Sequence, residues 1–143
     1  MMFLKTCRGH VGFDHIAMPT SNAERLIAFY KNLGFTINDE DAWRAGDARV
    51  FSIQVGDSKI NVHPESHIAT LRGPAATPGC TDICFVWSGT TDECEKMLND
   101  AGVEIISGPG PRTGGRGSDV PAVSMYARDP DQNLLEWMVY LND

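Results

Sequence analysis

The strongest constraint on the fold is an internal repeat, because the 143-residue chain carries the same order of elements twice. Two helices are predicted, over 21–33 and 90–101, each with apolar residues spaced i, i+3, i+4 and i+7. Each begins with Ser or Thr followed three residues later by Glu, the pattern of a capping box, and each is closed by glycine. The defining residues are Ser21, Glu24, Leu26, Phe29, Tyr30, Leu33 and Gly34, and in the second helix Thr90, Glu93, Cys94, Met97, Leu98, Ala101 and Gly102.

Segments of strand character flank both helices in the same order, one before each helix and three after it. The predicted strands are 13–18, 35–38, 49–55 and 59–63 in the first half, and 81–87, 103–106, 122–127 and 133–140 in the second. We therefore predict an α+β fold with a single domain over 1–143. It consists of two βαβββ modules, at about 11–66 and 79–141, which form a curved mixed sheet with the helices outside.

Composition narrows the class of function. The formal net charge is −7 and the basic residues are scattered, which argues against nucleic acid as a partner. No apolar run approaches the roughly 20 residues that cross a bilayer, and the first residues lack the pattern of a secretory signal. The four cysteines contain no Cys-x-x-Cys pair. We expect a cytoplasmic, reduced protein with no membrane partner.

Four polar residues take matching places when the two halves are superimposed. His15 falls opposite Asp82, an offset of 82 − 15 = 67, and His63 falls opposite Glu136, an offset of 136 − 63 = 73. If the modules pack about a pseudo-two-fold axis, these four donors enter one concavity. Buried ionisable groups are costly unless they are paired or bound to a metal. The set therefore predicts a divalent metal site, and its mixed nitrogen and oxygen donors suit Zn, Ni, Mn or Fe(II).

An alternative interpretation makes each of these residues an ordinary satisfied polar group. His63 could pair with Glu65, and Glu136 could face solvent from its strand. For one residue alone that interpretation is preferable. The occurrence of all four at equivalent positions of a repeat favours the metal.

Three motifs resemble the vicinal oxygen chelate superfamily, which includes glyoxalase I, extradiol dioxygenases and the fosfomycin and bleomycin resistance proteins. The resemblance covers about 13–140. Its motifs are Asp14-His15-Ile16, Phe29-Tyr30-x-x-Leu33-Gly34-Phe35 and Arg128-Asp129-Pro130-Asp131-x-Asn133-Leu134-x-Glu136. Segments 81–84 and 108–114 resemble one branch more closely, that of glyoxalase domain-containing protein 5 and bacterial "virulence protein" relatives.

The resemblance implies a glyoxalase-like fold and a site with one divalent metal ion. The family's ligand positions fall on His15, His63, Asp82 and Glu136. Glyoxalases and dioxygenases usually place His where this chain has Asp82, so Asp82 is expected to be either a fourth ligand or a group that orients a ligand or water. The implied activity is that of a lyase or isomerase of lactoylglutathione lyase type. Its small substrate carries oxygens on adjacent atoms, and Glu136 acts as the base.

Two other functions remain open. An extradiol dioxygenase would use Fe(II), and Tyr126 resembles the tyrosine that binds catecholate in those enzymes, although a strand Tyr is more often a packing residue. A drug- or metabolite-binding resistance protein without turnover is the other, and the predicted ligands argue against it. A homodimer is expected from the family.

The glycine- and proline-rich segment 107–118 is interpreted as a surface loop or lid. As a hypothesis, Arg112 in this loop binds an anionic group of the substrate, because a guanidinium matches carboxylates and phosphates. His10 and His67 are interpreted as surface histidines. Cys84 could line the pocket, but we expect it to be a small buried hydrophobe instead.

Overall fold

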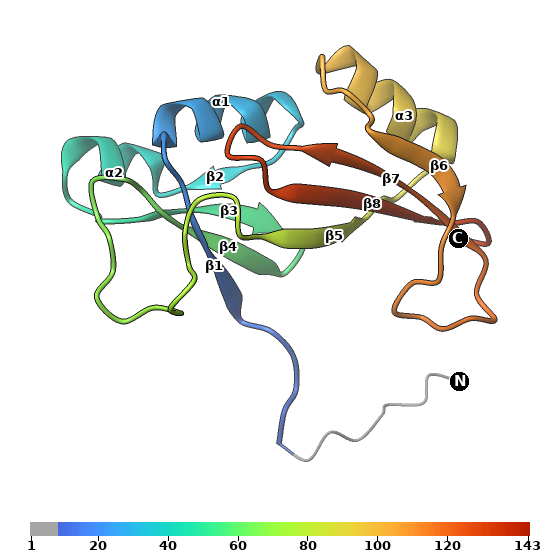
Figure 1. The fold of residues 1–143 in the computed structure, drawn as a ribbon, viewed down its shortest axis with the longest axis horizontal. Helices are drawn as coiled ribbons and strands as arrows, with labels where there is room; N and C mark the ends of the chain where they lie inside the picture. Colours follow the sequence, from blue (N-terminus) through green and yellow to red (C-terminus); the bar gives the residue numbers. More distant parts are fainter. Residues whose placement is uncertain (1–8) are drawn as a thin grey trace.

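A computed structural model describes residues 9–143, which form two modules with one four-stranded sheet each (Figure 1). The sheet of the first module has the strand order β1-β4-β3-β2, and that of the second has the order β5-β8-β7-β6. The elements are β1 (His15–Pro19), α1 (Ala23–Asn32), β2 (Ile37–Asn38), α2 (Glu40–Ala45), β3 (Phe51–Val55), β4 (Ser58–His63), β5 (Asp82–Val86), α3 (Thr91–Asp100), β6 (Ser107–Pro111), β7 (Ala122–Arg128) and β8 (Leu134–Tyr140).

Strand pairing is the same in both modules, so the predicted repeat is confirmed. In each sheet the first strand pairs in parallel with the last, β1 with β4 and β5 with β8, and the other pairs are antiparallel. Helix α2 has no counterpart in the prediction. It has only six residues, too few for an apolar period to appear, and Trp43 attaches it to the core through Phe51, with ring centroids 5.1 Å apart.

The two long helices turn the predicted stripes towards the core, where Phe29, Met97 and Ala101 are partly buried and the other stripe residues are buried. Only one of the helices begins as predicted. Thr90 and Glu93 form the capping box of α3. Helix α1 is instead capped by Asn22, whose side chain accepts a hydrogen bond from the Arg25 amide at 3.0 Å. Ser21 is not available as a cap because it bonds to Asp131 of the other module.

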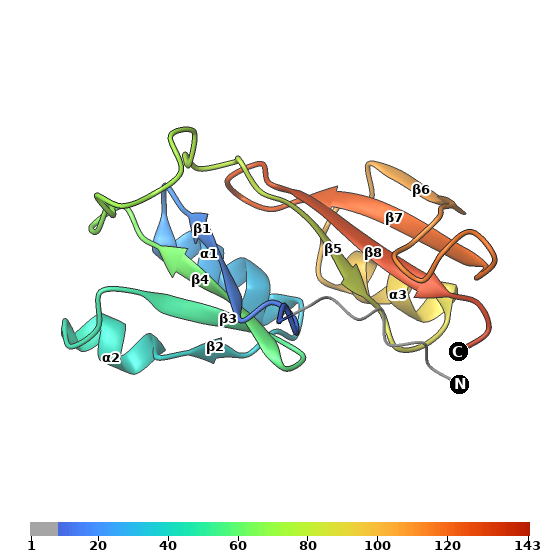
Figure 2. The ribbon, with the colours of Figure 1, turned by 90° about the horizontal axis from the view of Figure 1, so that it is seen from below.

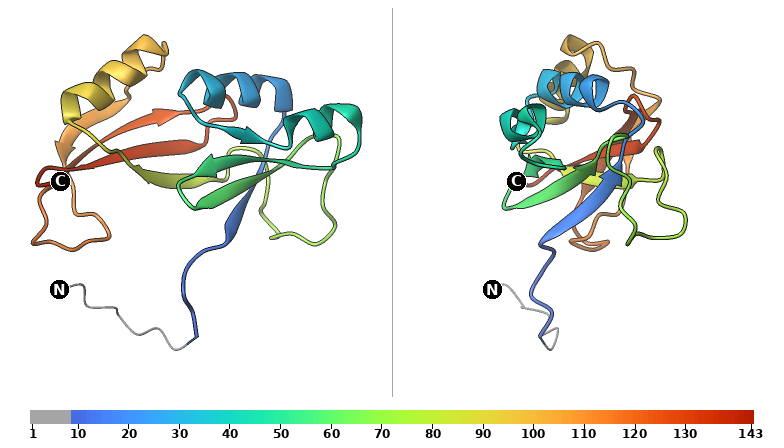
Figure 3. Two further views of the ribbon diagram at one scale, coloured as in Figure 1. Left: turned by 180° about the vertical axis from the view of Figure 1, so that it is seen from behind. Right: turned by 90° about the vertical axis from the view of Figure 1, so that its left-hand side faces the viewer.

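Each sheet has one face under the helices and one face without a helix, which we call the open face (Figures 2 and 3). Alternation along the strands decides which side chains lie on it. In β1, Met18 is buried in the core while His15 is exposed; in β5, Phe85 is buried while Asp82 is exposed. The two open faces lie on the same side of the molecule, opposite the helices (Figure 1).

The turn between β7 and β8 joins the two modules. Asp129 is buried there and its Oδ2 accepts hydrogen bonds from the Tyr30 hydroxyl of α1 and from the Asn133 amide, both at 2.8 Å. Asp131, two residues on, accepts a hydrogen bond from the Thr20 hydroxyl. The Asp-Pro-Asp motif thus stabilises the contact between the modules as well as the turn.

The predicted strand 103–106 is wrong, and β6 lies further along, in the segment interpreted as a loop. Val103 packs in the core without strand pairing, and β6 pairs with β7 at Ser107, Gly110 and Pro111 around a bulge. Proline cannot donate to a neighbouring strand, but β6 is an edge strand, where proline is tolerated. Among the described residues, none of the helices is both long and apolar enough to cross a membrane.

Candidate functional site

His15 opens β1 on the open face of the first module. Its Nδ1 lies 2.6 Å from Oδ1 of Asp14. A carboxylate can only accept a hydrogen bond, so Nδ1 carries the proton, and Nε2 is the nitrogen that offers a lone pair in the neutral imidazole. The same hydrogen bond lowers the pKa of Asp14. A histidine held in this way by a carboxylate has the arrangement common among metal-ligating histidines.

The strand register changes the equivalence expected from the sequence. In the second module Glu136 pairs with Cys84, two residues after Asp82. In the first module the residue two places after His15 is Ala17, and it pairs with Asn61. Asn61 is therefore the counterpart of Glu136, and His63 lies two residues further along β4. The equivalence of His63 and Glu136 is therefore wrong. The pairing requires an offset of 136 − 61 = 75 between the last strands, two residues more than the offset of 73 chosen from the polar residues alone.

The predicted ligands do not meet within one chain. His15 and His63 lie on the open face of the first module, and Asp82 and Glu136 lie on that of the second. His63 is opposite Pro19, four residues beyond His15, which is roughly 13 Å along the strand. Within residues 9–143 no three His, Cys, Asp or Glu side chains are grouped closely enough to hold a metal ion.

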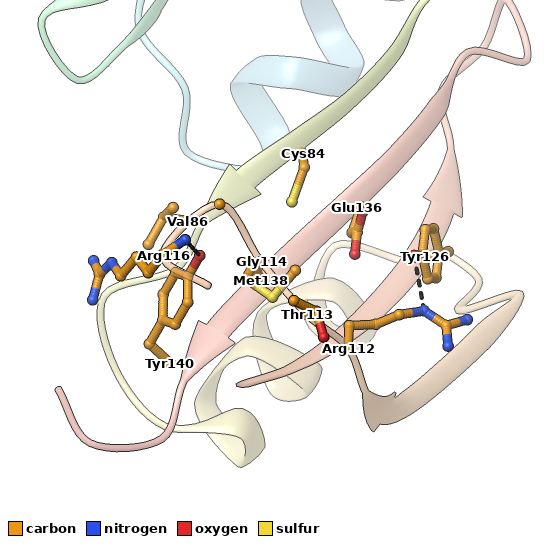
Figure 4. A pocket seen from close by; sticks show the side chains of 11 residues that line it. Cys84, Val86, Arg112, Thr113, Gly114, Arg116, Tyr126, Glu136, Met138 and Tyr140 are labelled. Carbon is orange, nitrogen blue, oxygen red and sulfur yellow. Dashed lines mark hydrogen bonds between the residues drawn. The ribbon is translucent and has the colours of Figure 1, made fainter. Parts of the chain in front are cut away.

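A cavity of about 450 Å³ lies on the open face of the second module, beside Glu136 (Figure 4). Glu136 and Tyr126 face each other across β8 and β7, and Arg112 Nε donates a hydrogen bond to the Tyr126 hydroxyl at 3.2 Å. Among the described residues Arg112 has no carboxylate within ion-pair distance. The structure thus brings Glu136, Tyr126 and Arg112 together.

Tyr140 holds the loop that forms the outer wall of this cavity. Its hydroxyl accepts a hydrogen bond from the Arg116 amide, and the Arg116 guanidinium lies 3.9 Å from the ring centroid. Arg116 also pairs with both carboxylate oxygens of Asp143, at 2.7 and 2.8 Å. Gly114 passes so close that a Cβ there would lie 2.1 Å from the hydroxyl oxygen. Arg116 is thus engaged in positioning the loop, while Arg112 is available to a ligand.

Cys84 lines the same cavity and lies opposite Glu136 on the neighbouring strand. It is not fully buried, contrary to the expectation of a buried hydrophobe. Desolvation, followed by the negative charge of Glu136, raises the pKa of the Cys84 thiol to about 12. The thiol is therefore protonated at neutral pH, and its Sγ donates to the Phe85 carbonyl oxygen at 3.8 Å.

A second cavity, of about 520 Å³, lies between the open face of the first module and the segment 64–78 that leads to the second module. We call it the linker cavity. His63 and His67 both line it, and His67, predicted to be a surface histidine, is half-buried there. Burial lowers the pKa of His63, and His67 contributes more to this shift than His15 does. Nothing in the sequence of 64–78 predicts a cavity, because its lining residues follow no period.

Comparison with known proteins assigns the family. The family model of the Glyoxalase/Bleomycin resistance protein/Dioxygenase superfamily matches residues 12–137. The chain belongs to this superfamily. Its relatives include the glyoxalase domain-containing protein RDO1 of Mycosarcoma maydis, 32% identical over 89% of this chain and 67% of that protein. The virulence protein STM3117 of Salmonella typhimurium is 33% identical over 90% of this chain and 83% of that protein.

Solved structures of the superfamily share the fold. The crystal structure of STM3117 has a TM-score of 0.79, with 30% identity, and the match covers 92% of this chain and 98% of that one. A lactoylglutathione lyase from Agrobacterium tumefaciens has a TM-score of 0.64 at 16% identity, covering 91% of this chain and 94% of that one, so that it supports the fold alone. The predicted superfamily and the predicted branch are both confirmed.

Proposed function

We propose that this superfamily member is a divalent-metal-dependent enzyme of lyase or isomerase type, with His15, Asp82 and Glu136 as the metal ligands. The observation that carries the proposal is the placement of these residues. His15 and Asp82 begin the equivalent strands β1 and β5. Glu136 lies on the neighbouring strand β8, paired with the residue two places after Asp82, on the same open face of the second module. Within residues 9–143 neither Asp82 nor Glu136 forms an ion pair, so both carboxylates are available.

The donor set fits a metal only when two open faces are brought together. We propose a homodimer in which the first module of one copy covers the second module of its partner, so that each site combines His15 with two carboxylates of the other chain. Such a two-fold interface is isologous and creates two equal sites. Exposed apolar side chains support an interface here: Phe13, just before β1, is 86% exposed, and Val86, at the end of β5, is 59% exposed. Both would lose contact with water in the dimer.

The prediction that His63 is also a ligand stays a prediction. The strand register argues against His63 as a ligand, because His63 is roughly 13 Å from His15 along the strand direction. Two imidazoles on the same sheet face at that separation do not converge on one ion. We assign His63 to the wall of the linker cavity instead. A metal analysis of His63→Ala separates the two roles.

A divalent ion in this site would act as a Lewis acid towards oxygens on adjacent atoms of the substrate. Glu136 would serve as the base that takes a proton from one substrate carbon and returns it to its neighbour, because a carboxylate can act as a general base. Tyr126 on β7 pairs directly with Glu136 on β8, and its hydroxyl can orient the substrate. Arg112, bonded to that hydroxyl, can bind an anionic substituent of the substrate.

A ring-cleaving dioxygenase is the second candidate, and the position of Tyr126 favours it. A phenol beside Glu136 could hold a catecholate next to Fe(II). The identity of the bound metal separates the candidates: iron with oxygen uptake supports the dioxygenase, and Zn, Ni or Mn without oxygen uptake supports the lyase or isomerase.

The test is the metal content of the purified protein, measured by elemental mass spectrometry without a nickel-affinity step. We expect near-stoichiometric metal in the wild type, its loss in His15→Ala and Glu136→Ala, a partial loss in Asp82→Asn and full retention in His63→Ala. Equal metal in all variants would contradict the ligand set. A wild type that takes up none of Zn, Ni, Mn or Fe(II) would support a binding protein without turnover.

A further inference from the structure

The linker cavity is a hollow with apolar walls that the proposed chemistry leaves unused. We propose that it binds an apolar, branched or cyclic part of the same substrate whose oxygens meet the metal. This inference rests on the proposed function for the metal-bound end of the substrate only. The cavity itself, of about 520 Å³, is within the range of small-molecule sites.

The lining of the cavity is mainly apolar, with two imidazoles at one side. The apolar residues are Ala17, Pro19, Pro64, Ile68, Ala69, Leu71, Ala76 and Pro78, and Arg72 is a charged residue of the same lining. The carboxylate of Glu65, which also borders the cavity, accepts a hydrogen bond from the Ala23 amide at the start of α1, at 3.0 Å. The ligand therefore meets hydrocarbon with a few polar groups, the usual composition of a site for a small organic molecule.

Two apolar side chains of the linker are left in water. Leu71 is 96% exposed and Ile68 is 70% exposed, and both border the cavity. Leaving such side chains in water gains nothing for folding, because burying a side chain of this size is worth roughly 1.5–3 kcal/mol. A ligand with an apolar body would cover them.

The position of His63 connects the cavity to the metal site. His63 ends β4 on the open face that also carries His15, and it forms part of the cavity wall. Ala17 and Pro19 continue the same face of β1 from His15 into the cavity. A molecule can therefore place its oxygens near His15 and its apolar body against Ala17 and the linker, past His63. The linker is visible below the sheets in Figure 1.

Two catechols test this arrangement. Catechol offers only the adjacent oxygens, and 4-tert-butylcatechol adds a branched apolar group of about the size of a leucine side chain. For the zinc-loaded dimer, titration calorimetry should give a dissociation constant about tenfold lower for 4-tert-butylcatechol, in keeping with burial of such a group. Ala76→Phe fills the cavity and should remove this difference. Ala75→Phe is the matched control, because Ala75 is exposed and does not line the cavity.

A second variant covers the case that Ala76→Phe misfolds. Leu71→Ser changes an exposed side chain of the cavity wall, so the fold should persist while the tenfold difference shrinks. In the metal-free protein, NMR should show nuclear Overhauser effects between the tert-butyl methyls and those of Leu71 and Ala76. These effects locate the apolar group without reference to the metal.

The outcomes separate the inference from the proposed function. If catechol itself binds no better to zinc-loaded than to metal-free protein, the metal site fails, and the NMR contacts still decide the inference. If catechol binds through zinc but the tert-butyl group adds nothing, the inference is overturned. The inference is also overturned if Ala76→Phe keeps the tenfold difference between the two dissociation constants, or if the nuclear Overhauser effects connect the tert-butyl group to residues outside the linker cavity.

Discussion

At the scale of single residues, neighbouring side chains determine what each candidate donor can do. Asp14 fixes the tautomer of His15 by accepting from Nδ1, so the nitrogen left over is the one that can bind a metal. Glu136 lies beside a protonated thiol, a phenol and a guanidinium rather than in an ion pair. Arg112 and Arg116 belong to the same loop, but Asp143 and Tyr140 engage only Arg116.

We predict that Asp14→Asn weakens metal binding without abolishing it. The asparagine retains the shape of the aspartate but removes the negative charge that holds the Nδ1–H of His15, and losses of this kind are typically 10–100-fold in affinity. Competition against a zinc chelator measures the effect. Asp57→Asn, in the β3–β4 turn, is the control and should leave the affinity unchanged. Equal affinities in both variants would contradict the role of Asp14.

The raised pKa of Cys84 predicts slow alkylation. Its folded-state pKa of about 12 lies above the ordinary value of 9.0, so the thiolate is rarer in the native protein than in the unfolded chain at pH 8. Iodoacetamide should therefore modify Cys84 at least about tenfold more slowly in native than in urea-unfolded protein. The raised pKa adds stability below about pH 9 that is lost as the pH rises towards 12. Peptide mass spectrometry follows the rate; equal native and unfolded rates at pH 8 would contradict the account.

At the scale of the elements, the Asp-Pro-Asp turn explains how two similar modules form one body. Buried Asp129 receives the Tyr30 hydroxyl from the other module, and burial next to this carboxylate raises the pKa of Tyr30 well above its ordinary value. The sequence predicted the turn but not this contact. Turn residues reveal themselves by local chemistry, whereas a contact between residues 99 positions apart has no local signal.

Removal of the Tyr30 hydroxyl should destabilise the whole chain. In Tyr30→Phe the buried Asp129 loses one donor, which costs about 1–3 kcal/mol of the free energy of unfolding. Urea denaturation followed by circular dichroism measures the change. Tyr126→Phe, which removes a hydroxyl from the partly exposed cavity wall, is the matched control and should change stability far less. A larger loss of the free energy of unfolding in Tyr126→Phe than in Tyr30→Phe would refute the contribution of the Tyr30–Asp129 contact.

At the scale of the whole molecule, the two open faces determine what one chain can and cannot do. Repeat, helix stripes and motifs predicted the modules correctly because these features depend on local periodicity and on family motifs. The register of β4 against β1 makes Asn61, and not His63, the counterpart of Glu136. This register is set by how the strands pair in three dimensions and could not be predicted from the order of polar residues along the chain. The linker cavity was missed for a similar reason: an aperiodic segment becomes a wall only in three dimensions.

The central claim is that each metal site is shared between two copies, and a hybrid dimer tests it most directly. One copy carries His15→Ala, the other carries Asp82→Asn with Glu136→Gln, and two affinity tags other than polyhistidine isolate the mixed species. Neither mutant homodimer should hold metal. The hybrid should hold one ion per dimer, because one of its two shared sites combines an intact His15 with intact carboxylates.

The reverse hybrid pairs a wild-type copy with a copy that carries all three substitutions. Shared sites predict no bound metal there, since each site then contains one damaged half. Sites within single chains predict the opposite pattern: an empty first hybrid, and one ion in the second from the intact wild-type chain. That opposite pattern, measured by elemental mass spectrometry, would contradict the account.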